Sequence, residues 1–275
     1  MRPQVLVTLT TVMLCVTTAS AETVIETFDG GSNVGGWTFG SPNGFIDPTG
    51  GNPGPFYHDT FLDTYAPQPR TTVDSIFTGD YRANNVTSVG IDLVLFYVDF
   101  SADGRPLTVV LRSDNDTPAD WSDDWAAYCM GERNVPLVGE GWISYDFAIP
   151  SQETSLPAGW EFILFGPNSP PLPDWNDVIT DVDQLIFFYG DPTMFFIFQA
   201  WDVGLDNPRI SYEPEPCFGD LDGDDDVDLA DLAQLLANYG TTEGAVYEDG
   251  DLDEDGDVDL ADLAALLAVY GTTCP

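Results

Sequence analysis

Lysine is absent from this 275-residue chain, and seven arginines are its only permanently cationic side chains. Forty-seven aspartates and glutamates oppose them, which gives a formal net charge of −40 at pH 7. Proteins that bind nucleic acids or anionic membranes neutralise phosphates with lysine and arginine. The composition therefore argues against both kinds of partner and favours cations and neutral, hydroxyl-rich ligands. Solubility in a salty medium accounts for part of the acidic excess.

Long apolar runs are also missing, except at the N-terminus. Arg2 precedes an apolar run over 5–16, and Ala19, Ser20 and Ala21 follow it. A short charged region, an apolar segment of this length and a small-x-small site are typical of a secretory signal peptide. The run is too short to cross a bilayer. We therefore expect a signal peptide over 1–21 and a secreted or cell-surface mature chain without a membrane insertion.

Histidine and cysteine are scarce. His58 is the single histidine, so a Ser-His-Asp triad or a catalytic zinc site would have to be built around it; its setting after a Gly/Pro-rich loop favours a structural role. No G-x-S-x-G or phosphate-binding glycine loop occurs. Of the four cysteines, Cys15 lies in the signal peptide, and Cys217 and Cys274 bracket the C-terminal region as a plausible disulfide. Cys129 is then expected to be a buried thiol.

The region 22–212 has the pattern of an all-β domain. Its apolar segments are rich in β-branched and aromatic residues and are separated by Gly, Pro, Asn and Asp clusters. No convincing amphipathic helical period occurs in it. We therefore predict a β-sandwich, specifically a jelly roll. The segments expected to form strands are 89–100, 107–111, 142–149, 162–165, 182–189 and 195–203.

A Pro/Glu linker, 213–216, separates this domain from a duplicated region, 217–275. Residues 226–242 and 257–273 differ at only two positions and are offset by 31 residues. Each copy begins with a twelve-residue loop that carries aspartate at positions 1, 3, 5, 7, 9 and 12. This is the ligand spacing of a calcium loop, in which position 7 contributes its backbone carbonyl. The expected ligands are Asp220, Asp222, Asp224, Asp226, Asp228 and Asp231 in the first loop, and Asp251, Asp253, Asp255, Asp257, Asp259 and Asp262 in the second.

Each loop is followed by the pattern of a short amphipathic helix. Leucines and a tyrosine recur at i, i+3, i+4 and i+7, and Gly240 and Gly271 are placed to end the helices. We expect the two apolar faces to bury each other. At loop position 6, Gly256 suits a sharp turn, and Asp225 tolerates a positive φ better than most residues. Val227 and Val258 at position 8 are expected to tie the loops together.

No helix pattern enters either loop, and position 12 is Asp rather than the Glu of an ordinary EF-hand. Residues 217–275 thus resemble the type I dockerin module, with paired loops that have exiting helices only. The resemblance implies two calcium ions, calcium-dependent folding and docking to a cohesin-like receptor. It also implies a setting of polysaccharide catabolism, because family dockerins sit mostly on polysaccharide-degrading enzymes and carbohydrate-binding proteins.

One part of the dockerin pattern is missing. The family's cohesin-reading positions usually carry Ser or Thr, whereas this chain has Leu229-Ala230 and Leu260-Ala261, without the later basic helix residues. Calcium binding therefore carries over more strongly than cohesin binding. Another surface receptor, an apolar partner surface or a purely structural terminal module is equally compatible with the sequence.

The end of the larger region, 201–210, reads WDVGLDNPRI. This segment resembles the last strand of carbohydrate-binding jelly rolls, and the matching N-terminal stretch is 26–29. That resemblance implies a structural calcium, here a third ion with Glu26, Asp29 and Asp206 as ligands. A candidate glycan-binding loop spans 120–128, where aromatic and acidic residues alternate; for any one of these aromatics, packing in the core is the competing role. The candidate ligand-stacking residues are Trp121, Trp125, Tyr128 and Trp175.

For the larger domain we predict the first of three functions, and the other two remain alternatives. The first is a non-catalytic jelly roll that binds a polysaccharide or matrix glycan. The second is a glycoside hydrolase or polysaccharide lyase, but acids are so abundant that no catalytic pair stands out. The third is a structural cell-surface component without glycan binding.

Overall fold

The computed structural model describes residues 22–72, 74–115, 117, 122–164, 173–194, 196–213 and 217–273. The described chain forms two compact units, 22–213 and 217–273. The expected signal peptide and residues 214–216 of the expected linker lie outside the described residues. No helix among those described is long and apolar enough to cross a membrane.

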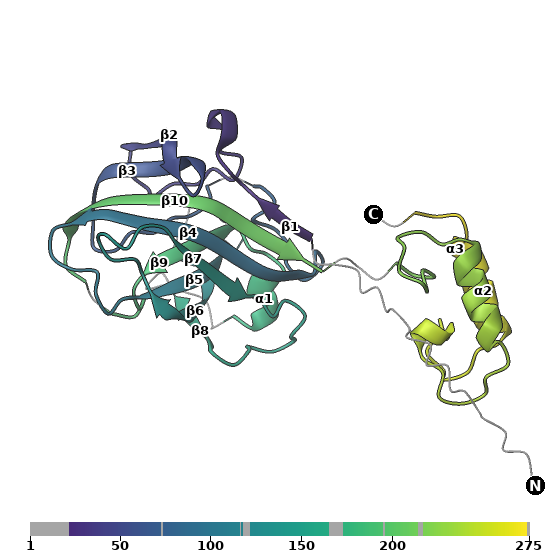
Figure 1. Ribbon diagram of the computed structural model, residues 1–275. Coiled ribbons are helices and arrows are strands. Elements are labelled where there is room, and N and C mark those ends of the chain that lie inside the picture. The colour runs from purple at the N-terminus through teal and green to yellow at the C-terminus, as the bar shows by residue number, and fades with distance from the viewer. Residues whose placement is uncertain are drawn as a thin grey trace, which may run out of the picture. The chain divides into compact units, whose positions relative to one another are not determined.

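The first unit consists of two antiparallel sheets (Figure 1). The larger has the strand order β2-β3-β10-β4-β7, with β1 also paired to β10, and the smaller has the order β8-β6-β5-β9. The predicted all-β sandwich is therefore confirmed. The strands are β1 (Glu22–Ile25), β2 (Gly44–Gly51), β3 (Gly54–Thr64), β4 (Val86–Val98), β5 (Pro106–Ser113), β6 (Trp125–Asn134), β7 (Ile143–Ala148), β8 (Trp160–Leu164), β9 (Gln184–Tyr189) and β10 (Gln199–Tyr212).

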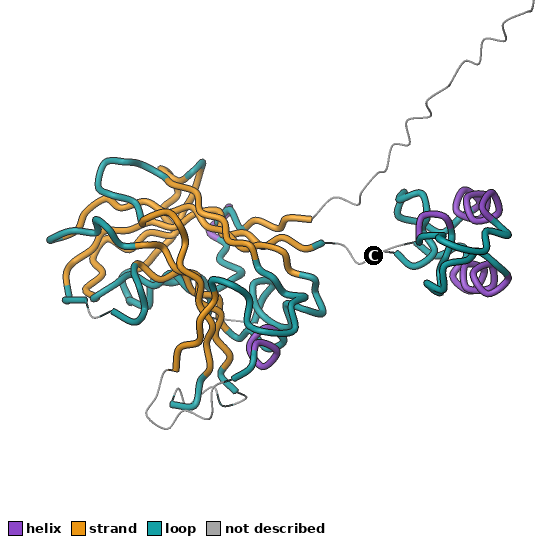
Figure 2. The backbone as a smooth tube through the Cα atoms, turned by 90° about the horizontal axis from the view of Figure 1, so that it is seen from below, coloured by secondary structure: helices purple, strands orange, loops and turns teal. Residues whose placement is uncertain are grey.

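The strands of the first unit lie in two layers (Figure 2). Aromatic side chains join the two sheets in one core. The ring of Phe147 on β7 lies 6.0 Å from that of Phe187 on β9, and Tyr189 of β9 meets Trp201 of β10 edge to face at 6.1 Å. Edge-to-face pairs add to the stabilisation from burying these large rings. Successive side chains of a strand point to opposite faces of its sheet. On β5 and β9, every second side chain therefore lies on the face of the smaller sheet that is turned away from this core.

The segments expected to be strands correspond to β4, β5, β7, β8, β9 and β10, with shifted ends. The sequence missed β1, β2, β3 and β6. It also missed the short helix α1 (Trp175–Ile179), which follows a proline-rich segment and begins with a capping box at Asp174. The candidate loop 120–128 was partly wrong, because residues from Trp125 onward form β6. Ala126 and Ala127 are both fully buried, so this strand lacks the apolar–polar alternation that would reveal it.

The second unit contains helices α2 (Leu229–Asn238) and α3 (Leu260–Val269) and the 3₁₀ turn η2 (Tyr247–Asp249). Asp228 and Asp259 cap the two helices, and Gly240 and Gly271 follow their ends with φ of 92° and 82°. These glycines end the helices as predicted, because a positive φ at this position costs glycine little.

The two repeats are joined crosswise. The N–H of Val227 donates to the carbonyl of Thr272 at 2.9 Å, and that of Val258 donates to Thr241 at 2.9 Å. Each loop valine thus bonds to the segment that follows the other repeat's helix. Both valine side chains are fully buried in the small core of this unit. The valines therefore tie the repeats together through the helix ends.

The expected burial of the helix faces was only partly right. Leu235 and Leu266 are fully buried, but Leu236 of α2 is 51% exposed and Leu267 of α3 is 53% exposed. Two ten-residue helices in a unit of this size cover only a narrow stripe of each other, so the rest of each apolar face stays in solvent. Tyr239 and Tyr270 are exposed as well.

Candidate functional site

The two acidic loops, 220–231 and 251–262, share a backbone geometry that turns successive carboxylates inward. Positions 4 and 6 of each loop have a positive φ. In the first loop these are Gly223 at 77° and Asp225 at 68°, and in the second Glu254 at 59° and Gly256 at 89°. Each loop therefore contains one glycine and one residue with a Cβ in the left-handed region, where a side chain costs about 1–2 kcal/mol.

Replacing Asp225 with glycine should stabilise the calcium-bound second unit by about 1 kcal/mol, because it relieves this left-handed strain. The reciprocal change, Gly256→Asp, should destabilise it by a similar amount. Thermal unfolding followed by far-ultraviolet circular dichroism measures both effects. Asp225→Asn is the matched control, because it removes the charge and keeps the Cβ. Equal stabilisation by Asn and Gly would show that charge, rather than backbone strain, dominates at this position.

The loops bring most of the predicted ligands together. Four groups of three aspartates have ligand atoms that all lie within 4.8 Å of one another. Each loop supplies two groups, and among the described residues all groups of this kind belong to the second unit. Asp224 is the one predicted ligand outside them; its Oδ1 accepts the N–H of Asp226 at 3.3 Å. The groups are Asp220, Asp222 and Asp231; Asp226, Asp228 and Asp231; Asp251, Asp253 and Asp255; and Asp257, Asp259 and Asp262.

Asp231 and Asp262 at position 12 close the loops, and both are completely buried. Oδ1 of Asp231 accepts the N–H of Leu221 at 2.6 Å, and Oδ2 accepts that of Asp228 at 2.7 Å. Asp262 repeats the arrangement with Leu252 and Asp259, each at 2.7 Å. A carboxylate held by backbone donors at both oxygens fixes the start of the loop against the first turn of the helix.

Asp226 and Asp257 have an unexpected role. The sequence predicts backbone carbonyl ligands at position 7, but the structure gathers the carboxylates of both residues into the ligand groups. Their Oδ1 atoms are buried and have no hydrogen-bond partner. A buried carboxylate oxygen without a partner is costly unless a cation compensates it. The all-oxygen donor set fits calcium, a hard cation that takes six to eight oxygen ligands.

The pKa values of the loop aspartates also favour a bound cation. Burial, and after it a neighbouring loop carboxylate, raises the pKa values of Asp222, Asp226, Asp253 and Asp257 above the ordinary value of 3.8. With these pKa values raised, the ion-free folded loops bind protons more readily than the unfolded chain. Their contribution to stability is therefore greatest at acidic pH and declines as the pH rises through the raised values. A bound divalent cation offsets this repulsion at neutral pH.

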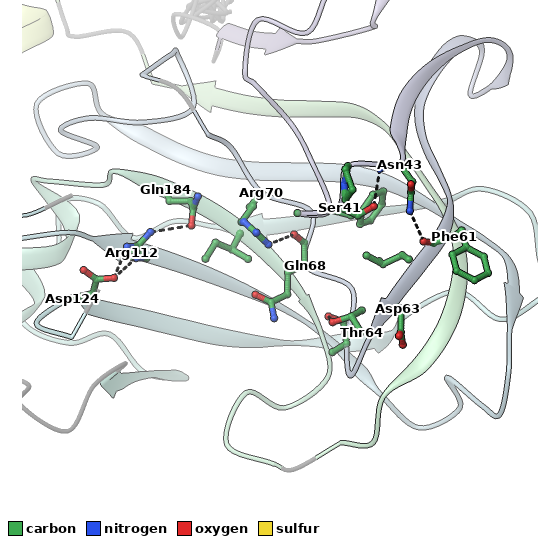
Figure 3. A pocket seen from close by; sticks show the side chains of 16 residues that line it. Ser41, Asn43, Phe61, Asp63, Thr64, Gln68, Arg70, Arg112, Asp124 and Gln184 are labelled. Atoms are coloured by element: carbon green, nitrogen blue, oxygen red, sulfur yellow. Dashed lines mark hydrogen bonds and ion pairs between the residues drawn. The ribbon is translucent and has the colours of Figure 1, made fainter. Parts of the chain in front are cut away.

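A separate cavity of about 680 Å³ lies in the first unit (Figure 3). Arg112 on β5 and Gln184 on β9 line it, and Arg70 lines it from the segment that pairs with β9 at Ile186. Its rim includes Ser41 and Asn43 before β2 and Phe61 on β3. This volume and the mixture of apolar and polar lining groups are typical of a small-molecule or oligosaccharide site.

Charged groups in the cavity are partly paired. Nε of Arg112 donates to Oδ2 of Asp124 at 2.6 Å, and Nη1 donates to Oε1 of Gln184 at 3.3 Å. Burial raises the pKa of Asp124, and the bond to Arg112 opposes that rise. The sequence analysis did not identify this site. Two of the seven arginines, Arg70 and Arg112, line the cavity, and their scarcity in the chain was the signal that could have drawn attention to them.

Two of the predicted ligand-stacking aromatics, Trp175 and Tyr128, are buried and do not line the cavity. Trp175 is 1% exposed and packs edge to face against Trp160 at 5.1 Å. Tyr128 is also buried, and its hydroxyl bonds to Glu161 at 2.6 Å. Neither ring presents a free face in this structure. Trp125 is partly buried against the core, and Trp121 lies outside the described residues.

The predicted ligands of a third ion do not form a group of gathered ligand atoms among the described residues. Glu26 is buried and accepts the N–H groups of Val34 and Gly35. Asp206 accepts the N–H of Asn52 at 2.5 Å, and burial raises the pKa of Asp206 to about 6. Both carboxylates therefore hold loops in place, whereas Asp29 accepts the hydroxyl of Thr27.

The remaining predicted residues have structural surroundings. His58 lies between Asp202, at 2.7 Å from its Nε2, and Asp47, at 3.5 Å from its Nδ1. Cys129 has a free, partly buried thiol. Cys217 is disulfide-bonded, and its expected partner, Cys274, lies outside the described residues. None of these groups lines the cavity.

Comparison with known proteins does not assign a family. No family model matches the chain. The Tat proofreading chaperones DmsD of Salmonella paratyphi A and Salmonella typhimurium are each 28% identical over 138 residues, 50% of this chain; the chain spans 59% of their length. An exo-beta-agarase structure has a TM-score of 0.37 and 13% identity, covering 69% of this chain and 24% of that one. The L4b domain of human laminin alpha-2 has a TM-score of 0.33 and 10% identity, covering 74% of this chain and 97% of that one.

Proposed function

We propose that this protein is a secreted, modular binding protein. Its C-terminal unit holds two calcium ions, and its β-sandwich binds a polysaccharide without cleaving it. The observation that carries the calcium assignment is the pair of buried, unpartnered Oδ1 atoms of Asp226 and Asp257, each inside a group of aspartates. Charge excess alone can produce one such group. The same geometry in two crosswise-joined repeats favours two ion sites.

The C-terminal unit is proposed to attach the protein to a receptor, as its dockerin-like sequence suggests. Its exposed apolar residues support this role, because solvent-facing leucines and tyrosines in such an acidic unit favour a protein partner. They occur twice, at equivalent positions of the two helices, so a partner can bind in two orientations related by a pseudo-twofold axis. These residues are Leu229, Leu236, Tyr239, Leu260, Leu267 and Tyr270.

The cavity of the β-sandwich supports the second half of the proposal. It is lined by amide, hydroxyl and charged side chains that suit sugar hydroxyls, and the ring of Phe61 at its rim is 67% exposed. An exposed ring of this kind stacks on the apolar face of a sugar. The buried Trp175 and Tyr128 have no such surface, so the cavity is the better candidate.

Two measurements test the proposal on the full secreted chain. Isothermal titration should find two calcium ions per chain, and insoluble polysaccharides should retain the protein without releasing oligosaccharides. Phe61→Ala should reduce retention about tenfold, with tryptophan fluorescence confirming that the sandwich is folded. A calcium stoichiometry of zero would contradict the first assignment. Oligosaccharide release would replace the binding role with a glycoside hydrolase or polysaccharide lyase.

A further inference from the structure

We infer that the cavity selects a sugar with an anionic substituent, a carboxylate or a sulfate ester, and that Arg70 binds the anion. The inference rests on the proposed polysaccharide binding and specifies its ligand class. It reverses the expectation from composition, by which an acidic chain favours neutral or cationic ligands. The reason is local: of the two arginines that line the cavity, Arg112 is paired with a carboxylate and Arg70 is not.

Arg70 is half-buried and has no carboxylate partner among the described residues. Nη1 of Arg70 donates a long hydrogen bond to the carbonyl oxygen of Gln68 at 3.4 Å. Loss of solvent, and after it the nearby charge of Arg112, lowers the pKa of Arg70. A guanidinium carries five N–H donors in a planar fork that matches carboxylate and sulfate oxygens. An anion in the cavity would supply the acceptors that Arg70 lacks.

The second arginine of the cavity, Arg112, differs from Arg70 because its guanidinium is paired with a carboxylate. Arg112 is held by Asp124 and Gln184, and so it contributes no net positive charge to a ligand. Arg209, on the larger sheet, is likewise paired with Asp92 and Asp146. Asp63 and Asp124 also line the cavity, but among the described residues Arg70 makes no ion pair with either of them.

Phe61 adds a second requirement. Its ring lines the same cavity and is 67% exposed, so it offers a face to the apolar side of a sugar ring. A simple inorganic anion has no apolar face. The combination of an anion for Arg70 and a sugar ring for Phe61 describes an acidic sugar.

The lining residues form an elongated arrangement. Figure 3 shows Arg112 and Asp124 toward one end, Arg70 and Gln68 between, and Phe61 toward the other end. A glycan can therefore stack one ring on Phe61 while a neighbouring ring presents its anionic group to Arg70. The strongly acidic surface opposes the approach of such a polymer, but at 0.15 M salt the Debye length is about 8 Å. Repulsion from distant carboxylates is thus screened, whereas contact pairing in the cavity persists.

The test compares matched glycans on the full chain with calcium at 0.15 M salt. One pair is short-chain dextran sulfate and dextran, and the other is oligogalacturonate and its methyl ester. The anionic member of at least one pair should bind about ten- to a hundredfold more tightly, as expected for one charge-assisted contact. The pair that shows the preference identifies sulfate or carboxylate as the recognised group.

Variants locate the effect. Arg70→Gln should abolish the preference, and Arg70→Lys should keep part of it because the charge remains. Arg133→Gln is the matched control, since Arg133 is exposed and lies over Tyr145, away from this cavity. Phe61→Ala should weaken the binding of both glycans of a pair equally. The preference itself is measured on the unaltered chain, so that test does not depend on any variant folding.

Equal binding of charged and neutral glycans would overturn this inference and leave the proposed polysaccharide binding intact. A preference unaffected by Arg70→Gln in a folded protein would also overturn it. Failure of every polysaccharide to bind would contradict the proposed function itself.

Discussion

Removing calcium from the full chain should unfold the C-terminal unit and leave the β-sandwich folded. From Glu213 onward the sequence contains no lysine, arginine or histidine, so the clustered loop carboxylates have no internal counterion. At free calcium about a hundredfold above the dissociation constant, each site contributes about 2.7 kcal/mol to folding. Two sites therefore contribute roughly 5 kcal/mol, as much as the entire stability of many small domains.

The chain contains its own control for this experiment. All seven tryptophans belong to the first 213 residues, so tryptophan fluorescence reports the sandwich alone. Helices α2 and α3 supply most of the described helical residues, so the far-ultraviolet helical signal reports the second unit. Excess chelator should abolish the helical signal without changing the fluorescence, and calcium should restore it. A helical signal that persists in chelator would contradict calcium-dependent folding.

Asp231→Ala should cause the largest loss of stability among single loop substitutions. The change removes a predicted calcium ligand and leaves the buried N–H groups of Leu221 and Asp228 without their acceptors. Each unsatisfied buried donor costs about 1–3 kcal/mol, so the loss of two acceptors should destabilise the calcium-bound unit by at least about 2 kcal/mol. Chemical unfolding followed by the helical signal measures this loss, and titration should show fewer than two bound calcium ions.

Asp262→Ala is the internal replicate, because its carboxylate makes the equivalent bonds in the second loop. Asp225→Asn is the matched control, since it removes the same charge from an exposed position outside the ligand groups. The two alanine variants should be similarly destabilised, and the control should bind calcium normally. If all three variants lost the same stability, net charge rather than loop closure would explain the effect.

The two acidic loops illustrate what a sequence predicts well. Each loop places its predicted ligands within twelve residues, and ligands so close along the chain converge whenever the local turns form. The turns themselves are local too, as the positive φ of Asp225 shows. Spacing does not indicate whether Asp226 offers its carbonyl or its carboxylate, and the structure places its carboxylate in a ligand group.

The strands show where local patterns fail. The β-branched segments of β4 and β9 were recognised from composition, but β6 was taken in part for a ligand-binding loop. Trp175 and Tyr128 were proposed as ligand contacts on aromatic content alone. Their burial depends on strands and a helix brought together from distant parts of the chain, which no local pattern reports.

By itself, the sequence determined the all-β class of the first unit and the duplicated acidic loops of the second, because both depend on periodicity and spacing over a few residues. Only the tertiary structure decided where a ligand can enter the sandwich. The cavity joins Asn43, Phe61, Arg70, Arg112, Asp124 and Gln184 from separate segments of the chain. Their proximity follows from strand order and the direction in which each side chain leaves its strand, and both are properties of the assembled sheets.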